Sequence, residues 1–163
     1  MVSTETLRRF PLFAHQSDYM LKEIAMISEE VDLEADQWLF HEKAPATKLC
    51  VVLEGGIALT MYLYLNGRGQ NVSMTSPLGK GELLGWSALV KPHIYTLGAQ
   101  AVKKSRVICI DAAPLSALLD DNPEYGYYML HQIAEVMADR LVYKYIQLLS
   151  IVNSQAQPVE ESV

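Results

Sequence analysis

The side chains that most often carry catalysis or bind metal ions are few in this chain and lie far apart in sequence. Its four histidines form no H-x-H, H-E-x-x-H or i,i+4 pair, so a histidine-rich metal centre would lack its ligands. No G-x-S-x-G nucleophile elbow and no phosphate-binding P-loop occur. Two cysteines, Cys50 and Cys109, cannot form a structural zinc site alone, and both lie in apolar runs typical of core packing. We therefore expect no enzyme activity, no metal and no other cofactor.

One segment, residues 79–101, combines features suited to holding a small ligand. It opens with glycines at positions 79, 81 and 85, and Trp86–Leu89 then fits one helical turn that Pro92 ends. A glycine in front of a short helix leaves backbone N–H groups pointing outward, which suits an anion. An ordinary connection between two strands would show the same pattern, and these residues alone leave both interpretations open.

Short strands separated by turn residues are the elements that would position this segment. The expected strands cover residues 27–33, 38–40, 48–53, 57–65, 71–75, 83–84, 97–102 and 106–110. Asn66 and Gly67 give the strongest hairpin signal, because both tolerate positive φ. The pattern predicts a mainly β fold with flanking α-helices, built around a jelly-roll (double-stranded β-helix) barrel over about residues 27–110.

Helices are expected on both sides of the barrel. Ser17 is the predicted N-cap of a helix that runs to about residue 25, and an apolar entry segment, residues 10–13, precedes it. Asp111 is the predicted N-cap of a short helix with Pro114 in its first turn. Pro123 then opens a long helix to about residue 153, which would measure roughly 45 Å at 1.5 Å per residue.

The long helix carries two apolar stripes. The first consists of Leu130, Ile133, Met137, Leu141, Tyr145, Leu148 and Val152, and the second of Val136, Tyr143, Ile146 and Leu149. One small barrel cannot cover both stripes over such a length. We therefore expect a dimerisation helix that pairs with a second copy in a homodimer, and the alternative is a helix that wraps its own domain.

The length and net charge of the chain limit the classes of partner that we expect. A chain of 163 residues suits one domain, here residues 1–153, followed by a disordered acidic tail at 154–163. The net charge is −6 and no basic stripe is visible, so we expect no nucleic-acid partner. The N-terminus lacks the apolar region of a signal peptide, and no run approaches about 18 apolar residues. We expect no membrane association and a cytoplasmic location.

Several motifs in order resemble the cyclic-nucleotide-binding domain of the cyclic-AMP receptor and fumarate–nitrate regulator superfamily. The sequence FPLF at residues 10–13 looks like that family's entry segment, WLF at 38–40 with Glu42 like its second strand, and VVLEG at 51–55 like its hairpin motif. GELLG at 81–85, followed by SAL at 87–89, looks like its phosphate-binding cassette. The resemblance covers about residues 7–152 and implies a jelly roll with a long dimerising helix after it.

The departures from this family concern the charged residues of the pocket. Relatives that bind cyclic nucleotides carry a glutamate after the cassette glycine for the ribose, and an arginine about ten residues on for the phosphate. Alignment on Gly85 puts Trp86 at the glutamate position and Tyr95, beside Thr96, at the arginine position. Glu82 could serve as the glutamate in a different register, which fits the later spacing less well. The DNA-binding helix-turn-helix that usually follows is not present in this sequence.

The resemblance therefore implies a sensor without the usual phosphate partner. The ligand-binding residues expected from it are Gly85, Trp86, Ser87, Ala88, Tyr95, Thr96, Lys144 and Tyr145, with Lys144 as the proposed positive group. We expect a stand-alone regulatory module that senses a small effector of unknown identity and does not bind cyclic AMP tightly. The alternative is a degenerate sensor that acts as a module for binding a protein partner.

Overall fold

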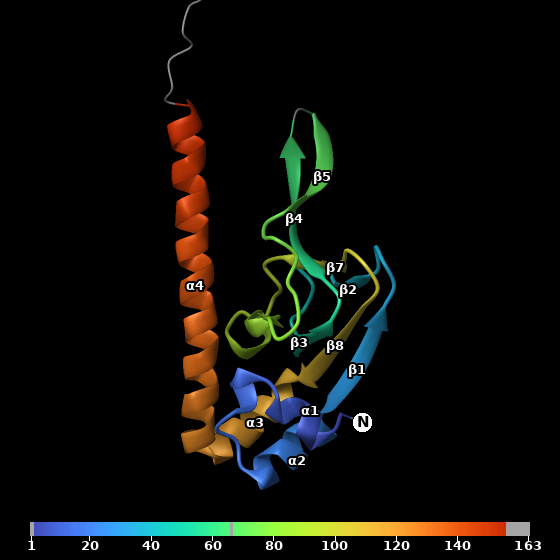
Figure 1. Ribbon diagram of the computed structural model, residues 1–163, viewed down its shortest axis with the longest axis vertical. Coiled ribbons are helices and arrows are strands. Elements are labelled where there is room, and N and C mark those ends of the chain that lie inside the picture. The colour runs from blue at the N-terminus through green and yellow to red at the C-terminus, as the bar shows by residue number, and fades with distance from the viewer. Residues whose placement is uncertain (1, 66, 156–163) are drawn as a thin grey trace, which may run out of the picture.

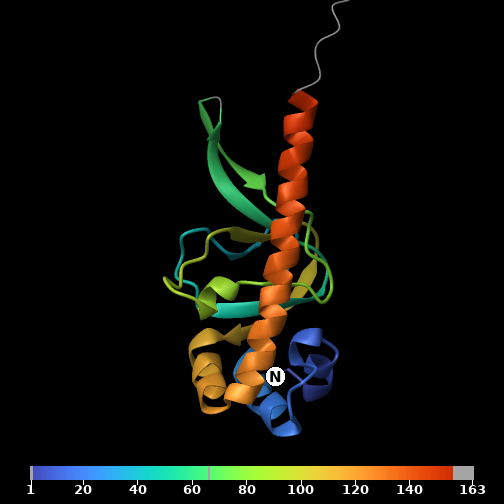
Figure 2. The same ribbon diagram turned by 90° about the vertical axis from the view of Figure 1, so that its left-hand side faces the viewer.

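The computed structural model describes residues 2–65 and 67–155 and consists of two four-stranded antiparallel sheets with helices at one end (Figures 1 and 2). One sheet has the order β1-β8-β3-β6 and the other β2-β7-β4-β5. The strands are β1 (Ser28–Leu33), β2 (Trp38–Phe40), β3 (Lys48–Glu54), β4 (Ile57–Leu65), β5 (Arg68–Ser73), β6 (Leu83–Leu84), β7 (Gly98–Ala101) and β8 (Ser105–Asp111). The expected jelly-roll barrel with flanking helices is confirmed.

Strands β3 and β8 are buried on both faces, and their side chains alternate between two separate hydrophobic clusters. Leu49 and Ile108 belong to the cluster shared with the helices, whereas Cys50 and Cys109 belong to the cluster inside the barrel. Because successive side chains on a strand point to opposite faces, two such strands need continuous apolar runs. The two cysteines face each other across the β3–β8 pair and are buried and unbridged, as their sequence context predicts.

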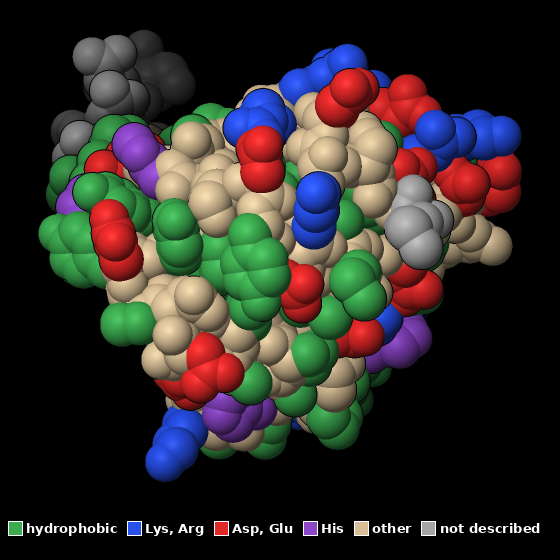
Figure 3. Space-filling view, turned by 90° about the horizontal axis from the view of Figure 1, so that it is seen from below, with side chains coloured by type: hydrophobic (Ala, Val, Ile, Leu, Met, Phe, Trp, Pro, Cys, Tyr) green, Lys and Arg blue, Asp and Glu red, His purple; other side chains and the backbone are tan. Residues whose placement is uncertain are grey.

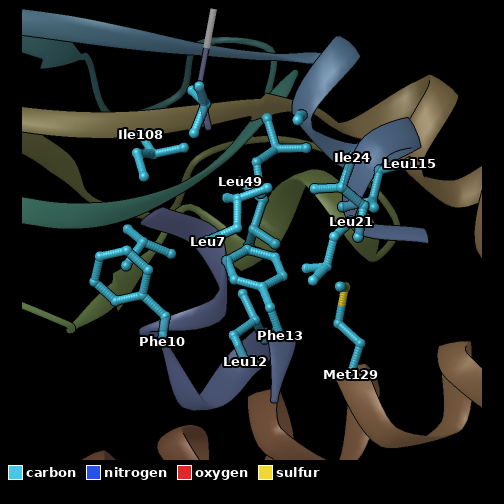
Figure 4. Packing of buried hydrophobic residues seen from close by; sticks show 14 of the residues in the cluster. Leu7, Phe10, Leu12, Phe13, Leu21, Ile24, Leu49, Ile108, Leu115 and Met129 are labelled. Atoms are coloured by element: carbon cyan, nitrogen blue, oxygen red, sulfur yellow. The ribbon is translucent and has the colours of Figure 1, made fainter. Parts of the chain in front are cut away.

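The helical end of the molecule is built from α1 (Thr4–Arg8), η1 (Pro11–Phe13), α2 (Asp18–Met26) and α3 (Ala112–Asp121). Figure 4 shows Phe13 and Leu21 pointing into a common centre with residues of β3, β8 and α3. Both side chains are fully buried. The apolar entry segment at residues 10–13 therefore anchors the helices to the barrel, and Ser17 caps α2 through its side chain, as predicted.

Two local expectations need correction. Strand β5 begins at Arg68, directly after the hairpin turn, because β4 and β5 pair continuously from the turn onward. Asp111 stands at the N-cap of α3 but makes no side-chain capping bond, and its carboxylate instead lies 3.1 Å from the Lys48 ammonium. Glu29 and Asp111 raise the pKa of Lys48, chiefly through the hydrogen bond with Glu29.

Helix α4 (Pro123–Gln155) runs along one side of the barrel and extends past it, in the same direction as the β4–β5 hairpin (Figure 1). Its first turns pack on η1 and α3 and bury Met129 and Ile133, and Val136 packs against the same cluster. Beyond this point both apolar stripes are mostly exposed up to residue 150. The expected acidic tail at 154–163 lies outside the described residues apart from its first two, which are helical.

The surface of the helical end shows acidic and basic side chains interspersed with hydrophobic ones (Figure 3). No stripe of positive charge gathers on the face that this view presents. Among the described residues, no helix combines the length and the apolar composition needed to cross a bilayer.

Candidate ligand-binding site

The candidate site is built around residues 83–89, which we call the cassette: strand β6, Gly85 and the helical turn η2 (Trp86–Leu89). Strand β6 pairs with β3, so the cassette is attached to the edge of the β1-β8-β3-β6 sheet. Gly85 has φ +80°, and a Cβ atom there would lie 2.6 Å from the backbone oxygen of Lys48. Only glycine meets both conditions, because positive φ strains other residues and the oxygen belongs to rigid backbone.

Beside the cassette lies a hollow of about 30 Å³, which we call the cassette pocket. Its lining residues are Leu59, Gly85, Trp86, Ser87, Tyr95, Thr96, Leu97 and Arg140. A water molecule needs roughly 10–15 Å³ of such space, so this pocket has room for a few waters at most. A larger ligand can enter only if a lining side chain moves.

Tyr95 closes one side of the cassette pocket with its ring. Its hydroxyl donates to the Lys48 carbonyl at 3.0 Å and accepts from the Lys48 N–H at 3.1 Å. The ring stacks on Phe40 with centroids 3.8 Å apart, and burial raises the pKa of the phenol. Because both of these bonds join the hydroxyl to strand β3, the Tyr95 ring is held in place at the side of the cassette pocket.

Arg140 enters the cassette pocket from α4 on the opposite side. Its guanidinium carbon lies 4.6 Å from the centre of the Trp86 ring, a geometry suited to a cation–π contact. Nη2 donates a hydrogen bond to the Leu83 carbonyl oxygen. Arg140 thereby links α4 to the cassette, about two turns beyond the buried residue Ile133.

The charge of Arg140 is poorly compensated. Its Nη1 atom is buried and has no hydrogen-bond partner, and among the described residues no carboxylate forms an ion pair with Arg140. Burial lowers the pKa of the guanidinium, and the charge of Glu82 opposes this shift. A partly buried cation with a buried, unpaired donor atom is unfavourable, so the site favours an incoming anion or hydrogen-bond acceptor.

A second hollow of about 380 Å³, the helix groove, continues from the cassette pocket between α4 and the barrel. It is lined by Leu59, Thr75, Trp86, Leu97, Met137, Ala138, Arg140, Leu141 and Lys144. Four of these residues also line the cassette pocket, so the two hollows adjoin at Arg140. The volume lies in the range of small-molecule sites.

The structure brings together five of the eight residues expected from the sequence and separates the other three. Gly85, Trp86, Ser87, Tyr95 and Thr96 line the cassette pocket. The remaining residues are Ala88, Lys144 and Tyr145. Ala88 is buried behind the turn, where its N–H donates to the Gly85 carbonyl at 3.0 Å and is not available to an anion.

The two expected contacts from α4 lie elsewhere. Lys144 lines the helix groove, where its ammonium donates to the Gln147 side chain at 3.0 Å. Tyr145 is 60% exposed and lines neither the cassette pocket nor the helix groove. Glu82, the alternative ribose partner, accepts from the Gly79 N–H at 2.7 Å, a contact within its own loop.

Sequence reasoning missed Arg140, although the sequence contained a signal for it. Arg140 precedes Lys144 by four residues and therefore lies on the same helix face, one turn closer to the base of the barrel. Any argument that places Lys144 near the pocket applies more strongly to Arg140. Among the described residues, no group of histidine, cysteine or carboxylate side chains is arranged to hold a metal ion.

Comparison with known proteins identifies relatives of the whole domain. The family model described as the cyclic nucleotide-binding domain matches residues 30–122. A crystallised protein from Geobacter metallireducens, described as cyclic nucleotide-binding, shares 33% identity and a TM-score of 0.74 over 86% of this chain and 99% of its own. The N-terminal domain of a transcriptional regulator from Streptomyces coelicolor shares 29% identity and a TM-score of 0.63, over 82% and 93% of the two chains.

A curated relative places a similar domain within a larger protein. A protein of Rhodopseudomonas palustris described as a potassium channel protein is 25% identical over 135 residues, which are 83% of this chain. The match spans 31% of that relative's length.

The geometry at Gly85 predicts that alanine costs more stability there than at Gly67. Gly85→Ala should destabilise the protein by about 2–4 kcal/mol, because it combines positive-φ strain with a clash against the Lys48 carbonyl. Gly67→Ala is the matched control, since Gly67 has φ +77° and no atom within 4 Å of its added Cβ, so it should cost only about 1 kcal/mol. Urea unfolding measures both. Equal losses in the two variants would contradict the close contact of the cassette with β3.

Proposed function

The chain belongs to the cyclic nucleotide-binding domain family, and from that premise we propose that it is a regulatory module that senses a small effector in the cassette pocket. Its relatives include regulators and a protein described as a channel, in which such a domain would control another activity. We propose no enzymatic role, because the site joins a cation and hydroxyls without a paired acid and base or an activated nucleophile.

One observation carries this proposal: the same side chain lines the pocket and holds the long helix. Arg140 belongs to α4, contacts Trp86 and Leu83 of the cassette, and separates the cassette pocket from the helix groove. A ligand that takes the place of either contact must change how α4 is attached to the barrel. Binding free energy can shift a conformational equilibrium only through such a difference between two states.

The effector is proposed to be smaller or less polar than a cyclic nucleotide. In relatives an arginine of the cassette region binds the cyclic phosphate, and this chain has Tyr95 at that position with its hydroxyl already bonded to backbone. Trp86 stands where the ribose-binding glutamate is expected, and its ring lines the pocket. The proposed contact residues are Gly85, Trp86, Ser87, Tyr95, Thr96 and Arg140 in the cassette pocket and Lys144 in the helix groove. Ala88 and Tyr145, also expected from the sequence, line neither hollow.

A homodimer is proposed as the working assembly. Ile146, Leu148 and Leu149 are 60%, 64% and 62% exposed, and they lie on the part of α4 that extends past the barrel. Contiguous apolar side chains on a helix surface mark interaction sites, and a second copy presents an identical face. Pairing of two α4 helices would also give the change at Arg140 a route to the partner.

The second candidate function is a protein-interaction module whose pocket takes no ligand. The small size of the cassette pocket, about 30 Å³, favours it. Ligand-dependent stabilisation separates the two functions, because an effector at 100 times its Kd adds about 2.7 kcal/mol to the free energy of unfolding. A module without a ligand shows no such shift with any nucleotide or metabolite.

Cyclic AMP and cyclic GMP should bind no tighter than about 100 μM. Hydrogen bonds to a charged group contribute about 1.5–3 kcal/mol, so the loss of the cassette arginine alone weakens binding by roughly 10- to 150-fold. Calorimetry with the full chain measures both constants, alongside a thermal-shift screen of nucleotides and organic acids. A low-micromolar Kd for either nucleotide would show that Arg140 or another group replaces the missing arginine.

If two α4 helices pair in a homodimer, charged substitutions on the exposed face of α4 should disrupt the dimer, whereas a charged substitution elsewhere on the surface should not. Ile146→Asp combined with Leu149→Asp should convert the protein to a folded monomer, because these exposed residues lie three apart on one face of α4 and two charges would then face the partner helix. Met26→Glu is the control, since Met26 is 71% exposed at the end of α2 and should leave the dimer intact. Size-exclusion chromatography with light scattering reports the mass. A wild-type protein that is monomeric at high concentration would refute the pairing.

A further inference from the structure

In the part of the chain that the structure describes, two buried polar atoms beside the helix groove lack hydrogen-bond partners. They are Nη1 of Arg140, on α4, and Oγ1 of Thr75, on the loop between β5 and β6. Both residues line the helix groove, and both also line a neighbouring hollow of about 240 Å³. A buried donor or hydroxyl without a partner is unfavourable, so two of them beside one hollow suggest a group that would satisfy both.

Apart from Thr75, Arg140 and Lys144, whose ammonium donates to the Gln147 side chain, the helix groove is lined by apolar residues. Its walls come from Leu59 and Leu97 of the barrel side, the Trp86 ring, and Met137 and Leu141 of α4. A sugar with several hydroxyl groups would find few partners along these walls, and burying unpaired hydroxyls is costly. The groove instead suits an aliphatic chain or an aromatic ring of modest size.

The charges around Arg140 limit the charge of the ligand. Glu82 and Asp139 line the neighbouring hollow together with Arg140, and among the described residues neither forms an ion pair with the guanidinium. Their field opposes a second negative charge next to Arg140, and Lys144, the other positive side chain of the groove, already donates to Gln147. Nη1 of the guanidinium is unpaired, and a carboxylate would accept a charge-assisted hydrogen bond from it.

We propose that the helix groove binds an amphipathic monocarboxylate, with its carboxylate on Arg140 Nη1 and Thr75 Oγ1 and its apolar part between Trp86, Leu97 and Leu141. This inference rests on the proposed sensing function, because it names the ligand class of that site. The carboxylate replaces missing hydrogen bonds of Arg140, and the apolar part contacts α4 directly. Binding therefore strengthens the attachment of α4 to the barrel.

Calorimetry with matched ligands tests this proposal on the full chain. Octanoate and phenylacetate are the probes, and octanamide and phenylacetamide are the neutral controls of the same shape. At least one acid should bind with a Kd below about 1 mM, and its amide should bind at least about tenfold more weakly, because only the acid forms charge-assisted hydrogen bonds.

Three variants locate the binding group. Arg140→Gln should raise the Kd of the acid by roughly 10- to 100-fold, so that the acid no longer binds more tightly than the amide. Thr75→Val keeps the shape of the side chain but removes its hydroxyl, and it should raise the Kd of the acid by about 3- to 10-fold. Arg68→Gln is the matched control, since Arg68 is exposed at the start of β5 and should leave binding unchanged. If Arg140→Gln does not fold, Thr75→Val and the acid–amide pair still decide the question.

Several outcomes would overturn the proposal. Equal binding of acid and amide, or unaltered binding in Thr75→Val and Arg140→Gln, would exclude this carboxylate site. Failure of both acids to bind would do the same, whether the groove were empty or covered by a second copy. If another effector stabilised the protein in the thermal-shift screen while the acids did not, the ligand class would be wrong but the sensing function would stand.

Discussion

The contact of Arg140 with the cassette determines how the second half of α4 relates to the barrel. The helix is anchored at its start by Met129 and Ile133, and the exposed stripes beyond residue 136 give it little apolar support. Arg140 adds a cation–π contact with Trp86 and one hydrogen bond with Leu83, while its Nη1 remains unpaired. Such a contact holds the helix without satisfying the charge, so its strength can change when a ligand supplies the missing partner.

This arrangement moves the positive charge of the pocket from the cassette region to the helix. The sequence resemblance implies an arginine of the cassette region as the partner of a cyclic phosphate. Here Tyr95 stands at the arginine position as a wall bonded to Lys48, and the cation comes from α4 itself. A ligand that binds Arg140 therefore contacts α4 directly.

The sequence predicted the barrel well because its strands carry strong local signals. Most strand positions followed from apolar runs and turn residues, whereas the start of β5 was placed late because Arg68 and its neighbours are polar and pair through their backbone. The pocket was less predictable. Nothing in the sequence shows that the Tyr95 hydroxyl bonds to a strand nearly fifty residues away. Arg140 was overlooked in favour of Lys144, since the two share one helix face and tertiary packing decides which turn of α4 meets the cassette.

Hydrogen–deuterium exchange of Arg140→Ala tests most directly whether this single side chain holds α4 to the cassette. The account predicts faster amide exchange in α4 beyond Val136 and in residues 83–89 of the cassette, because each loses the contact that fixes it to the other. The helical base around Phe13 and Leu21, which Arg140 does not touch, should exchange as in the unaltered protein. Unchanged exchange in both α4 and the cassette would contradict the account.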